Sequence, residues 1–416
     1  MTAPLAASSS STPTELSATS DLAAVGTAAT RVLRPERALP GDAVRPTRAE
    51  VNLANLRHNL RVMQRCARGA EVWAVLKADG YGHGAKAVAR TLERAGASGV
   101  CVALLEEGIE LRQAGIRLPI LVMGGFYGRA WGELLRHDLT PVVHDPSQVQ
   151  ALADEVRFGS SGPIAIHVKV DTGMARLGVA TRDLEAMGAS LKRHPHVQLD
   201  GLMTHFACAD SGNTESLDHQ LALFEGATQT LRQQGLTARV RHAANSAATL
   251  LRPSTHLDFV RPGIALFGVE PSPGMCPELR PVMRVRSEVL ALHDLEPGMS
   301  VGYGATFRAT RRTRVATIPM GYADGLSRGL SNLGHLLVRG GRAPIVGNVS
   351  MDMTMIDVTD LPDVRVGDEC VVLGSQKGAH GEALLSAGTI ASLLGTIPWE
   401  VLTSISRRVP RFYREP

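Results

Sequence analysis

Lys77 follows a short apolar run, Val72 to Leu76, and precedes the glycine-rich turn ADGYGHG. Such a run is typical of a strand buried on both faces, and the carboxyl ends of such strands carry the chemistry of barrels and open parallel sheets. A lysine buried there has a lowered pKa and exposes a neutral amine, which can form a Schiff base. The alternative is a solvated lysine at a strand end, and this stretch alone favours that alternative because such lysines are common.

Four later strand-like runs also end in residues that could do chemistry. Because the carboxyl ends of barrel strands meet at one mouth, these residues are expected to form a single site together with Lys77. They are Lys169 with Asp171 and Arg176, then His205, then Asn245 with Ser246, and finally Arg261.

The elements that must position these residues alternate between strand and helix. From residue 48 to the segment RPGIALFG the alternation recurs about eight times, which predicts an α/β fold of the (β/α)8 TIM barrel type. After Pro281 the chain consists of short β-like runs between Gly, Pro and Asp turns, with no long helix until Ser386–Leu394. We therefore predict a barrel over residues 45–280 and a C-terminal, mostly-β domain over residues 281–416.

Residues 1–44 are rich in Ala, Ser and Thr and lack the cationic start and apolar core of a secretory signal, which predicts a disordered N-terminal extension. Arg31, Arg34 and Arg37 follow a stretch poor in acids, so a transit-type leader is the alternative.

The composition argues against several classes of protein. A net charge of +4 over 416 residues argues against nucleic-acid binding, and no apolar run is long enough to span a bilayer. The five cysteines show no metal-site or redox spacing, and we expect no metal. Free thiols are typical of a reducing compartment, so we expect a cytoplasmic protein.

The chain resembles the alanine racemase family, which are barrel-type enzymes that use pyridoxal 5'-phosphate (PLP). The resemblance runs from about Arg48 to Arg411. It rests on nine motifs in the family's order: AVLKADGYGHG (Ala74–Gly84), HVKVDTGMARLG (His167–Gly178), THFACAD (Thr204–Asp210), HAANSAA (His242–Ala248), RPGIALFG (Arg261–Gly268), VGYGATF (Val301–Phe307), MGYADG (Met320–Gly325), VGNVSMDM (Val346–Met353) and PWEVLTSISRRVPR (Pro398–Arg411).

The resemblance implies that Lys77 binds PLP covalently. It also implies that Tyr81, Ser246 and the backbone N–H groups of Gly263 and Ile264 hold the phosphate. Backbone N–H groups at a glycine-containing turn form an anion site, which agrees with this role. Ser246 could instead cap the helix that follows it.

Arg261 would face the pyridine nitrogen of PLP, and His205 would hold Arg261 in place. An arginine there leaves the ring neutral, whereas a carboxylate would keep it protonated and favour side reactions. Without the resemblance, His205 is read as a core histidine with satisfied hydrogen bonds.

Racemisation requires a proton to leave one face of Cα and return to the other. The resemblance implies Lys77 on one face and Tyr303 of a partner subunit on the other, so the active unit would be a homodimer with shared sites. A tyrosine has a reference pKa near 10 and needs a cationic neighbourhood to act as a base, and the charge of Arg261, relayed through His205, would supply it. Tyr303 could otherwise be a half-buried aromatic of the β domain.

Further residues are implied around the small-molecule substrate. Arg176 and the backbone N–H of the partner's Met351 would bind its carboxylate, since arginine suits a planar carboxylate. Lys169 lies at a position that is often carbamylated, or else it pairs with Asp171. Tyr322 and Asp352 match positions that line the entrance of the site.

Three positions depart from the family pattern. Arg407 replaces the tyrosine that contacts the phosphate and shapes the pocket, Asn348 replaces an arginine, and Ala175 often is glycine. Arg407 could still reach the phosphate as a cofactor-binding residue. A basic patch for nucleic acid around Arg407 lacks the interleaved aromatics that such a patch needs.

The resulting prediction is an isomerase that interconverts L-alanine and D-alanine and supplies D-alanine, a peptidoglycan precursor. A racemase of broader specificity, acting on serine for example, stays open because of Arg407 and Asn348. A barrel-type PLP decarboxylase would carry a carboxylate in place of Arg261 and a catalytic cysteine in the β domain, where Cys370 looks structural. A non-enzymatic PLP-binding protein would consist of the barrel alone.

Overall fold

The computed structural model describes residues 44–124, 130–158, 162–211 and 214–415. Residues 1–43 of the predicted extension lie outside this set. Within it, no helix has both the length and the apolar character that crossing a membrane requires.

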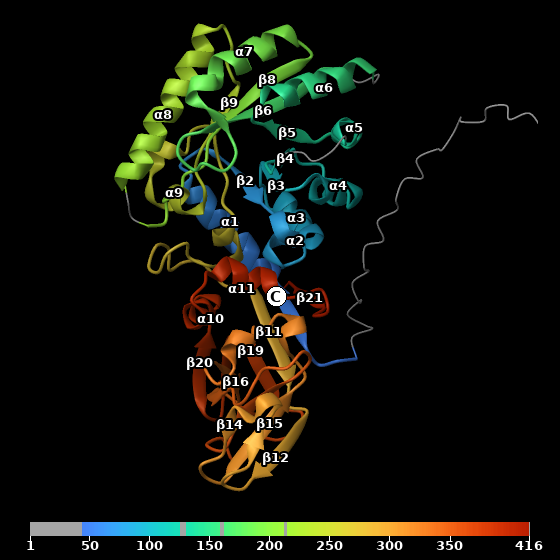
Figure 1. Ribbon diagram of the computed structural model, residues 1–416, viewed down its shortest axis with the longest axis vertical. Helices are drawn as coiled ribbons and strands as arrows, with labels where there is room; N and C mark the ends of the chain where they lie inside the picture. Colours follow the sequence, from blue (N-terminus) through green and yellow to red (C-terminus); the bar gives the residue numbers. More distant parts are fainter. Residues whose placement is uncertain (1–43, 125–129, 159–161, 212–213, 416) are drawn as a thin grey trace, which may run out of the picture. The chain divides into compact units, whose positions relative to one another are not determined.

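Eight parallel strands form a barrel in the described part of the chain, as the alternation of strands and helices predicts (Figure 1). Two backbone hydrogen bonds join the ends of the sheet, from Asp258 N–H to Arg241 O (3.0 Å) and from Arg261 N–H to Ala244 O (2.9 Å). In spatial order the strands are β10 (Phe259–Val260), β2 (Glu71–Val75), β3 (Gly99–Val102), β4 (Ile120–Val122), β5 (Thr140–Val143), β6 (Ile164–Asp171), β8 (Val197–Met203) and β9 (Val240–His242), with the short β7 (Val179–Ala180) beside β6.

Helices cover the outside of this barrel (Figure 1). The first of them shows how local sequence starts such a helix: the Asn52 side chain accepts the Asn55 N–H (3.0 Å), and Leu56, Leu60 and Met63 bury one face. The barrel helices are α1 (Leu53–Cys66), α3 (Ala85–Arg94), α4 (Leu105–Gln113), α5 (Trp131–Arg136), α6 (Pro146–Phe158), α7 (Leu184–Arg193), α8 (Thr214–Gln233) and α9 (Ser246–Leu251). The short segment α2 (Lys77–Tyr81) contains three residues with non-helical backbone.

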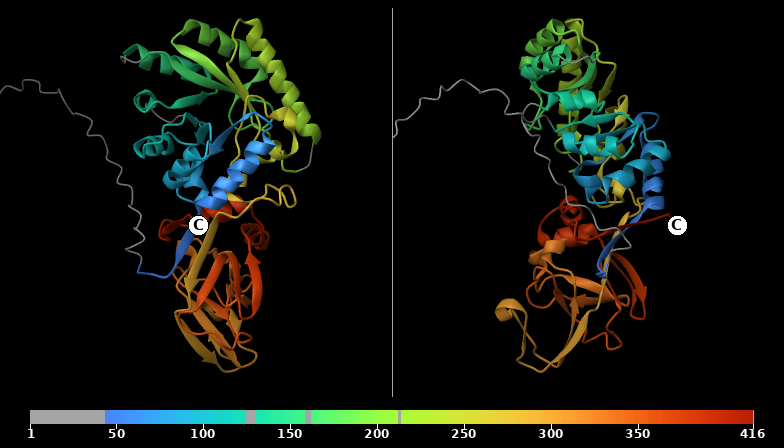
Figure 2. Two further views of the ribbon diagram at one scale, coloured as in Figure 1. Left: turned by 180° about the vertical axis from the view of Figure 1, so that it is seen from behind. Right: turned by 90° about the vertical axis from the view of Figure 1, so that its right-hand side faces the viewer.

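The C-terminal domain consists mainly of strands, seen in orange and red in Figure 2. Its main sheet runs β17 (Gly341–Pro344), β16 (His335–Val338), β19 (Glu369–Gly378), β11 (Met283–Glu288), β1 (Arg48–Asn52) and β21 (Arg411–Arg414), and β20 (Gly381–Leu385) pairs with β19. A second sheet holds β12 (Ala291–Leu295), β15 (Thr313–Ile318) and β18 (Thr354–Asp357), and β13 (Ser300–Val301) pairs with β14 (Phe307–Arg308). Two helices, α10 (Ala387–Leu394) and α11 (Pro398–Ser404), precede the last strand.

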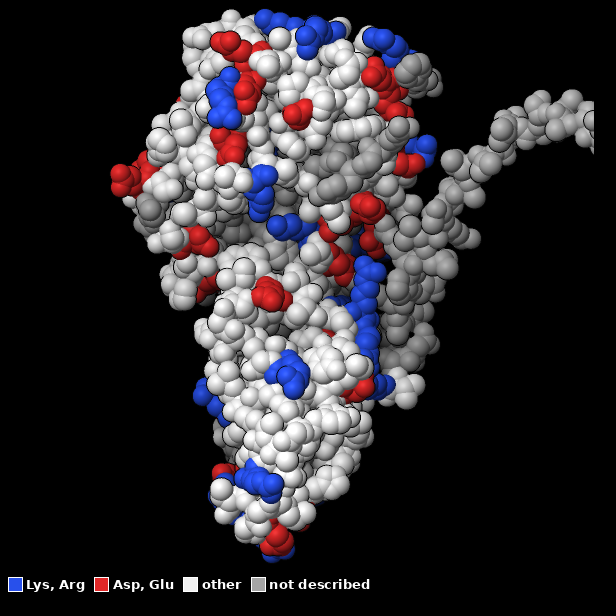
Figure 3. Space-filling view, in the orientation of Figure 1, with Lys and Arg blue, Asp and Glu red and all other residues white. Residues whose placement is uncertain are grey.

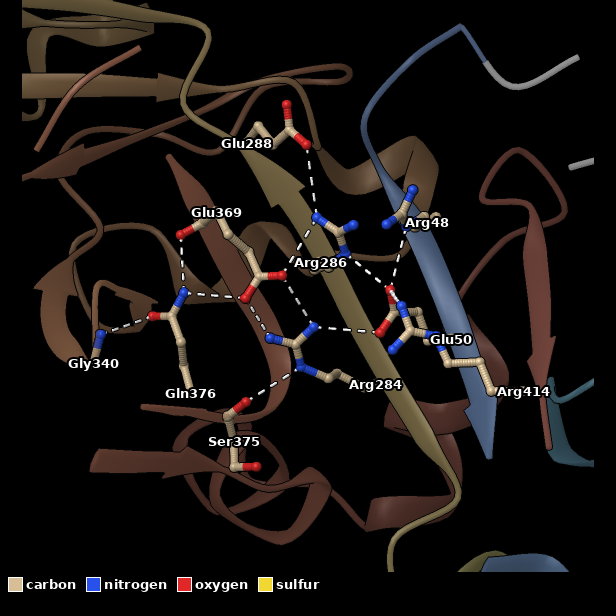
Figure 4. Close-up of polar contacts among 10 residues, drawn as sticks. All are labelled: Arg48, Glu50, Arg284, Arg286, Glu288, Gly340, Glu369, Ser375, Gln376 and Arg414. Atoms are coloured by element: carbon tan, nitrogen blue, oxygen red, sulfur yellow. Dashed lines mark hydrogen bonds and ion pairs between the residues drawn. The ribbon is translucent and has the colours of Figure 1, made fainter. Parts of the chain in front are cut away.

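Strand β1 belongs to this C-terminal sheet, although its residues fall inside the range 45–280 predicted for the barrel. It pairs antiparallel with β11 and parallel with β21. Its Glu50 is 4% exposed and contacts arginines from β1, β11 and β21, so the pairing also carries an ion-pair network (Figure 4). The position of β1 depends on partners more than 230 residues away in the chain, which a local pattern does not encode.

Acidic and basic side chains lie side by side over the upper part of the face drawn in Figure 3, which is the barrel. This mixture agrees with the small net charge of +4.

Candidate active site

A cavity of about 230 Å³ opens at the carboxyl ends of the barrel strands. Residues at or just after the ends of β2, β4, β6, β8, β9 and β10 line it, as expected for the mouth of a barrel. Seven of the residues predicted for the site lie in its wall: Lys77, Tyr81, His205, Ser246, Arg261, Gly263 and Ile264.

Lys77 begins a turn with left-handed backbone. Ala78 (φ 51°), Asp79 (φ 57°), Gly80 (φ 62°) and Tyr81 (φ 53°) follow it in sequence. This conformation costs roughly 1–2 kcal/mol for each non-glycine residue. Strain of this kind gathers at functional sites, where the surrounding structure holds it in place.

Three side chains hold this turn. Glu107 Oε1 accepts the Ala78 N–H at 2.6 Å, and Asp79 Oδ1 accepts the N–H of Ala85 at 2.8 Å. Arg411 Nε, from the last strand of the chain, donates to the carbonyl of Gly82 at 2.9 Å. The C-terminal segment therefore helps to position the turn that carries Lys77.

The environment of Lys77 favours its neutral amine. Burial lowers the pKa of Lys77 most, the nearby charge of Arg176 lowers it further, and Glu107 partly opposes both effects. A lysine with a lowered pKa is a better nucleophile and proton acceptor near neutral pH.

A cluster of small and polar groups forms a cradle at one side of the cavity. A Cβ added to Gly263 would lie 2.3 Å from the Tyr81 hydroxyl, so only glycine fits there. Ser246 Oγ accepts the Gly263 N–H at 2.9 Å. Ile264 opens a 3-10 helix, so its own N–H has no acceptor within that helix. Two hydroxyls and N–H groups converging in this way suit a phosphate, so these residues fit PLP.

The helix cap at this position is Asn245 and not Ser246. The Asn245 side chain accepts the Ala248 N–H at 3.0 Å, whereas the Ser246 hydroxyl faces Gly263. The alternative reading of Ser246 as a helix cap is therefore wrong.

Arg261 is 2% exposed and donates to neutral acceptors. Its guanidinium binds His242 Nδ1 (2.5 Å), the carbonyl of Thr204 (2.8 Å) and the carbonyl of Ala243 (3.0 Å). The expectation that His205 holds Arg261 is therefore not met by these bonds. The physical reason is position: His242 ends β9, which lies next to the strand that leads into Arg261.

The contact with Arg261 fixes the proton positions of two core histidines. Arginine can only donate, so His242 Nδ1 accepts, and the proton of His242 sits on Nε2, which donates to His167 Nδ1 at 2.8 Å. Gly201 makes room for His167, since a Cβ there would lie 2.5 Å from its ring. Sequence reasoning missed this pair, although the two histidines open the motifs HVKVDTGMARLG and HAANSAA.

His205 lines the cavity as a neutral group. Burial lowers its pKa well below the ordinary value, and the charges of Arg261 and Lys169 lower it further. Burial also lowers the pKa of Arg261, to about 10.

Lys169 lies near the carboxyl end of β6 and is 5% exposed. Burial, followed by the charges of Arg176 and Arg261, lowers its pKa to about 8. Asp171 Oδ1 accepts three backbone N–H groups of the following turn, at 2.9–3.1 Å. Its carboxylate therefore shapes that turn, while its charge only partly offsets the cations around Lys169.

Five residues predicted for the site do not line the cavity of their own chain: Lys169, Arg176, Tyr303, Met351 and Arg407. Tyr303 is 76% exposed, so it is not a half-buried aromatic, and Met351 is 52% exposed. Gly302 (φ 68°) and Gly304 (φ 73°) flank Tyr303, and the Asn348 side chain donates to its carbonyl at 2.7 Å. Asn348, which replaces the arginine of the family pattern, thus holds the segment that contains Tyr303.

The comparisons with known proteins cover both domains. Residues 51–271 match the family model "Alanine racemase, N-terminal domain", and residues 282–413 match "Alanine racemase, C-terminal domain". The chain belongs to the alanine racemase family. It is therefore an amino-acid racemase, which is an isomerase.

Individual relatives of this racemase agree with that assignment. An alanine racemase of Sorangium cellulosum is 61% identical over 379 residues, which is 90% of this chain and all of that one. The structure of alanine racemase from Streptomyces coelicolor A3(2) is 35% identical with a TM-score of 0.84, covering 90% of this chain and 99% of that chain. The structure of the Bacillus anthracis enzyme with bound L-Ala-P is 34% identical with a TM-score of 0.83, covering 89% and 95%.

Proposed function

We propose that this racemase interconverts L-alanine and D-alanine with PLP as its cofactor, and that Lys77 and Tyr303 are its two bases. The observation that carries the proposal is that Lys77, the cradle at Gly263 and the buried Arg261 line one cavity. The names of the relatives support the substrate. We further propose that the product D-alanine serves as a peptidoglycan precursor in the cytoplasm, and the five free cysteines support a reducing compartment.

Tyr81, Ser246, Gly263 and Ile264 would hold the phosphate of PLP, and Lys77 would bind the cofactor covalently. PLP acidifies the Cα–H of a bound amino acid by withdrawing electron density into its ring. Arg261 would lie against the ring nitrogen. Arginine stays protonated, and its three acceptors here are neutral and leave its positive charge uncompensated, so the ring nitrogen beside it would stay unprotonated.

The two bases would serve opposite faces of Cα. Lys77 Nζ takes or returns the proton on one face, and its lowered pKa suits that task. Tyr303 is exposed and lies outside the cavity of its own chain, so we infer that its hydroxyl serves the other face in a second copy. The proposed active unit is a homodimer with two shared sites.

The substrate carboxylate would be bound by Arg176 and by the backbone N–H of Met351 from the second copy. No acceptor of the Met351 N–H occurs among the described residues, so it can donate to a substrate. We propose that Arg407 lies near the cofactor in the assembled dimer, because it stands where the family has a tyrosine.

Lys169 is proposed as a carbamylated lysine. Its buried amine attacks CO2, forming a carbamate N–C bond and releasing one proton. A pKa of about 8 leaves enough neutral amine for this step near neutral pH, and the cations Arg176 and Arg261 would stabilise the carbamate. Incorporation of ¹³CO2, read as a carbamate carbon signal that Lys169→Ala lacks, tests this assignment.

Mixed dimers test the shared site. Lys77→Ala and Tyr303→Phe homodimers should each lose nearly all racemisation. Mixing them in equal amounts should restore about a quarter of the wild-type activity, because half the dimers are mixed and one of their two sites is intact. No restoration would mean that both bases come from one chain.

Solvent-deuterium exchange at Cα tests the reaction itself. Exchange with inversion from both enantiomers of alanine is expected. Comparable rates with serine would favour a racemase of broader specificity and implicate Arg407. Release of CO2 would indicate a decarboxylase, which the buried Cys370 in β19 argues against, since burial raises the pKa of its thiol.

A further inference from the structure

The turn that carries Met351 is laid against the segment 321–323 of the same domain. The N–H groups of Tyr322 and Ala323 donate to the carbonyls of Ser350 and Met351, both at 3.0 Å. Gly321 permits this approach, because a Cβ there would lie 2.3–2.4 Å from the same two carbonyl oxygens. The carbonyl of Met351 is therefore fixed, and the Met351 N–H takes part in neither of these bonds.

The buried carboxylate of Asp324 holds the segment 321–323 in place. Asp324 is 0% exposed and accepts the N–H of Gly321 at 3.1 Å. Arg45 binds both of its oxygens, at 2.7 and 3.0 Å. This bidentate pair neutralises Asp324. It also connects Arg45, which lies just before β1 in the sequence, to the Met351 turn.

Arg408 connects this anchor to the residue that follows Met351. Its Nη2 donates to Asp352 Oδ1 at 2.7 Å, and its Nε lies 3.5 Å from Asp324 Oδ1. The charges alternate in the order Arg45, Asp324, Arg408, Asp352, so each arginine is next to a carboxylate. The Arg408 side chain thus contacts both of the paired segments, 321–324 through Asp324 and 350–352 through Asp352.

We propose that Arg408 is a positioning residue for racemisation, which holds the Met351 N–H where it meets the carboxylate of the substrate. The proposal rests on the proposed function of Met351. Without Arg408 the turn keeps its two backbone bonds but loses the tie at Asp352, so the Met351 N–H is presented less often in the binding geometry.

Kinetics separate this role from a structural one. A carboxylate contact binds substrate and transition state alike, so its loss raises KM and leaves kcat nearly unchanged. For Arg408→Ala we expect KM for both enantiomers of alanine to rise about tenfold and kcat to change less than twofold. A tenfold change corresponds to the loss of one hydrogen bond between the Met351 N–H and the charged carboxylate of the substrate. The fold is retained because Asp324 keeps Arg45 and the Gly321 N–H.

The experiment compares Arg408→Ala, Arg408→Lys and Arg311→Ala in the holoenzyme. Arg311 forms an exposed pair with Asp360 (2.7 Å) in the same domain and serves as the matched control, with unchanged KM expected. Arg408→Lys keeps a charge for Asp352 and should bring KM within about threefold of the wild type. If Arg408→Ala does not fold, Arg408→Lys with its intermediate KM carries the test.

Amide hydrogen exchange gives a readout that does not need catalysis. Peptides covering 321–323 and 350–353 should exchange faster in Arg408→Ala than in Arg311→Ala. Unchanged exchange with unchanged KM would overturn the proposal, as would a loss confined to kcat. A wild type that does not racemise alanine refutes the proposed function instead, while the exchange data still decide whether Arg408 holds the turn.

Discussion

Replacing Glu50 by Gln tests whether one buried carboxylate holds the C-terminal sheet together. Four arginines surround it: Arg414 (2.6 Å), Arg286 (2.9 Å), Arg48 and Arg284 (both 3.3 Å), as Figure 4 shows. Glu288 and Glu369 are the other carboxylates of the cluster, so its net charge is +1 and becomes +2 in the variant. Glutamine keeps the shape of the side chain and removes the charge.

The expected loss follows from burial. Removing one partner of a fully buried ion pair costs about 3–5 kcal/mol, because the other charge stays uncompensated. Here the arginine side chains are 13–58% exposed, so water solvates the uncompensated charges and the loss of stability is smaller. We therefore expect Glu50→Gln to lower the free energy of unfolding by about 2–3 kcal/mol.

Urea unfolding, followed by far-ultraviolet circular dichroism, measures this loss. Glu288→Gln is the matched control in the same cluster. The Glu288 side chain is 40% exposed and contacts Arg286 at 3.6 Å, so its replacement should lower the free energy of unfolding by less than about 0.5 kcal/mol. In 1 M salt the screening length falls to about 3 Å, so the deficit of Glu50→Gln should shrink. Equal losses in the two variants, or wild-type stability of Glu50→Gln, would refute the reasoning.

Three further changes have expected outcomes. Gly263→Ala places a Cβ 2.3 Å from the Tyr81 hydroxyl and should weaken PLP binding at least tenfold, read by titrating the apoenzyme with cofactor. Gly201→Ala collides with the ring of His167 at 2.5 Å and should cost about 2 kcal/mol of stability in urea. Lys169 has a pKa of about 8 when folded against an ordinary 10.5, so between these pH values only the unfolded chain holds the proton. The wild type should therefore gain stability relative to Lys169→Met as pH rises through this window, measured by urea midpoints in CO2-free buffer.

The barrel and the convergence of its strand ends were predictable from local patterns. Lys77, Ser246 and Arg261 each follow a strand-like run, and the rule that barrel strands carry chemistry at one end brings them together. The structure places all three in one cavity. Helix α1 was predictable in the same way, because Leu56, Leu60 and Met63 recur at helical spacing within one short window.

Other features depend on partners far apart in the sequence. The bond from Arg261 to His242 follows from which strands become neighbours and which way their side chains point, whereas the family resemblance had implied His205 as the partner. The left-handed turn after Lys77 includes Ala78, a residue type that rarely adopts this backbone, so contacts from Glu107 and Arg411 help to hold it. Strand β1 has an ordinary strand pattern that fits either domain.

The pairing of β1 with β21 has a consequence for how the protein is made. Glu50 and Arg414 are 364 residues apart, and they meet across adjacent parallel strands. During synthesis the barrel strands find their neighbours in order of emergence, whereas β1 waits without its parallel partner until β21 has left the ribosome. The C-terminal sheet is then completed last, and a chain that ends before residue 411 leaves one edge of β1 unpaired and open to other strands.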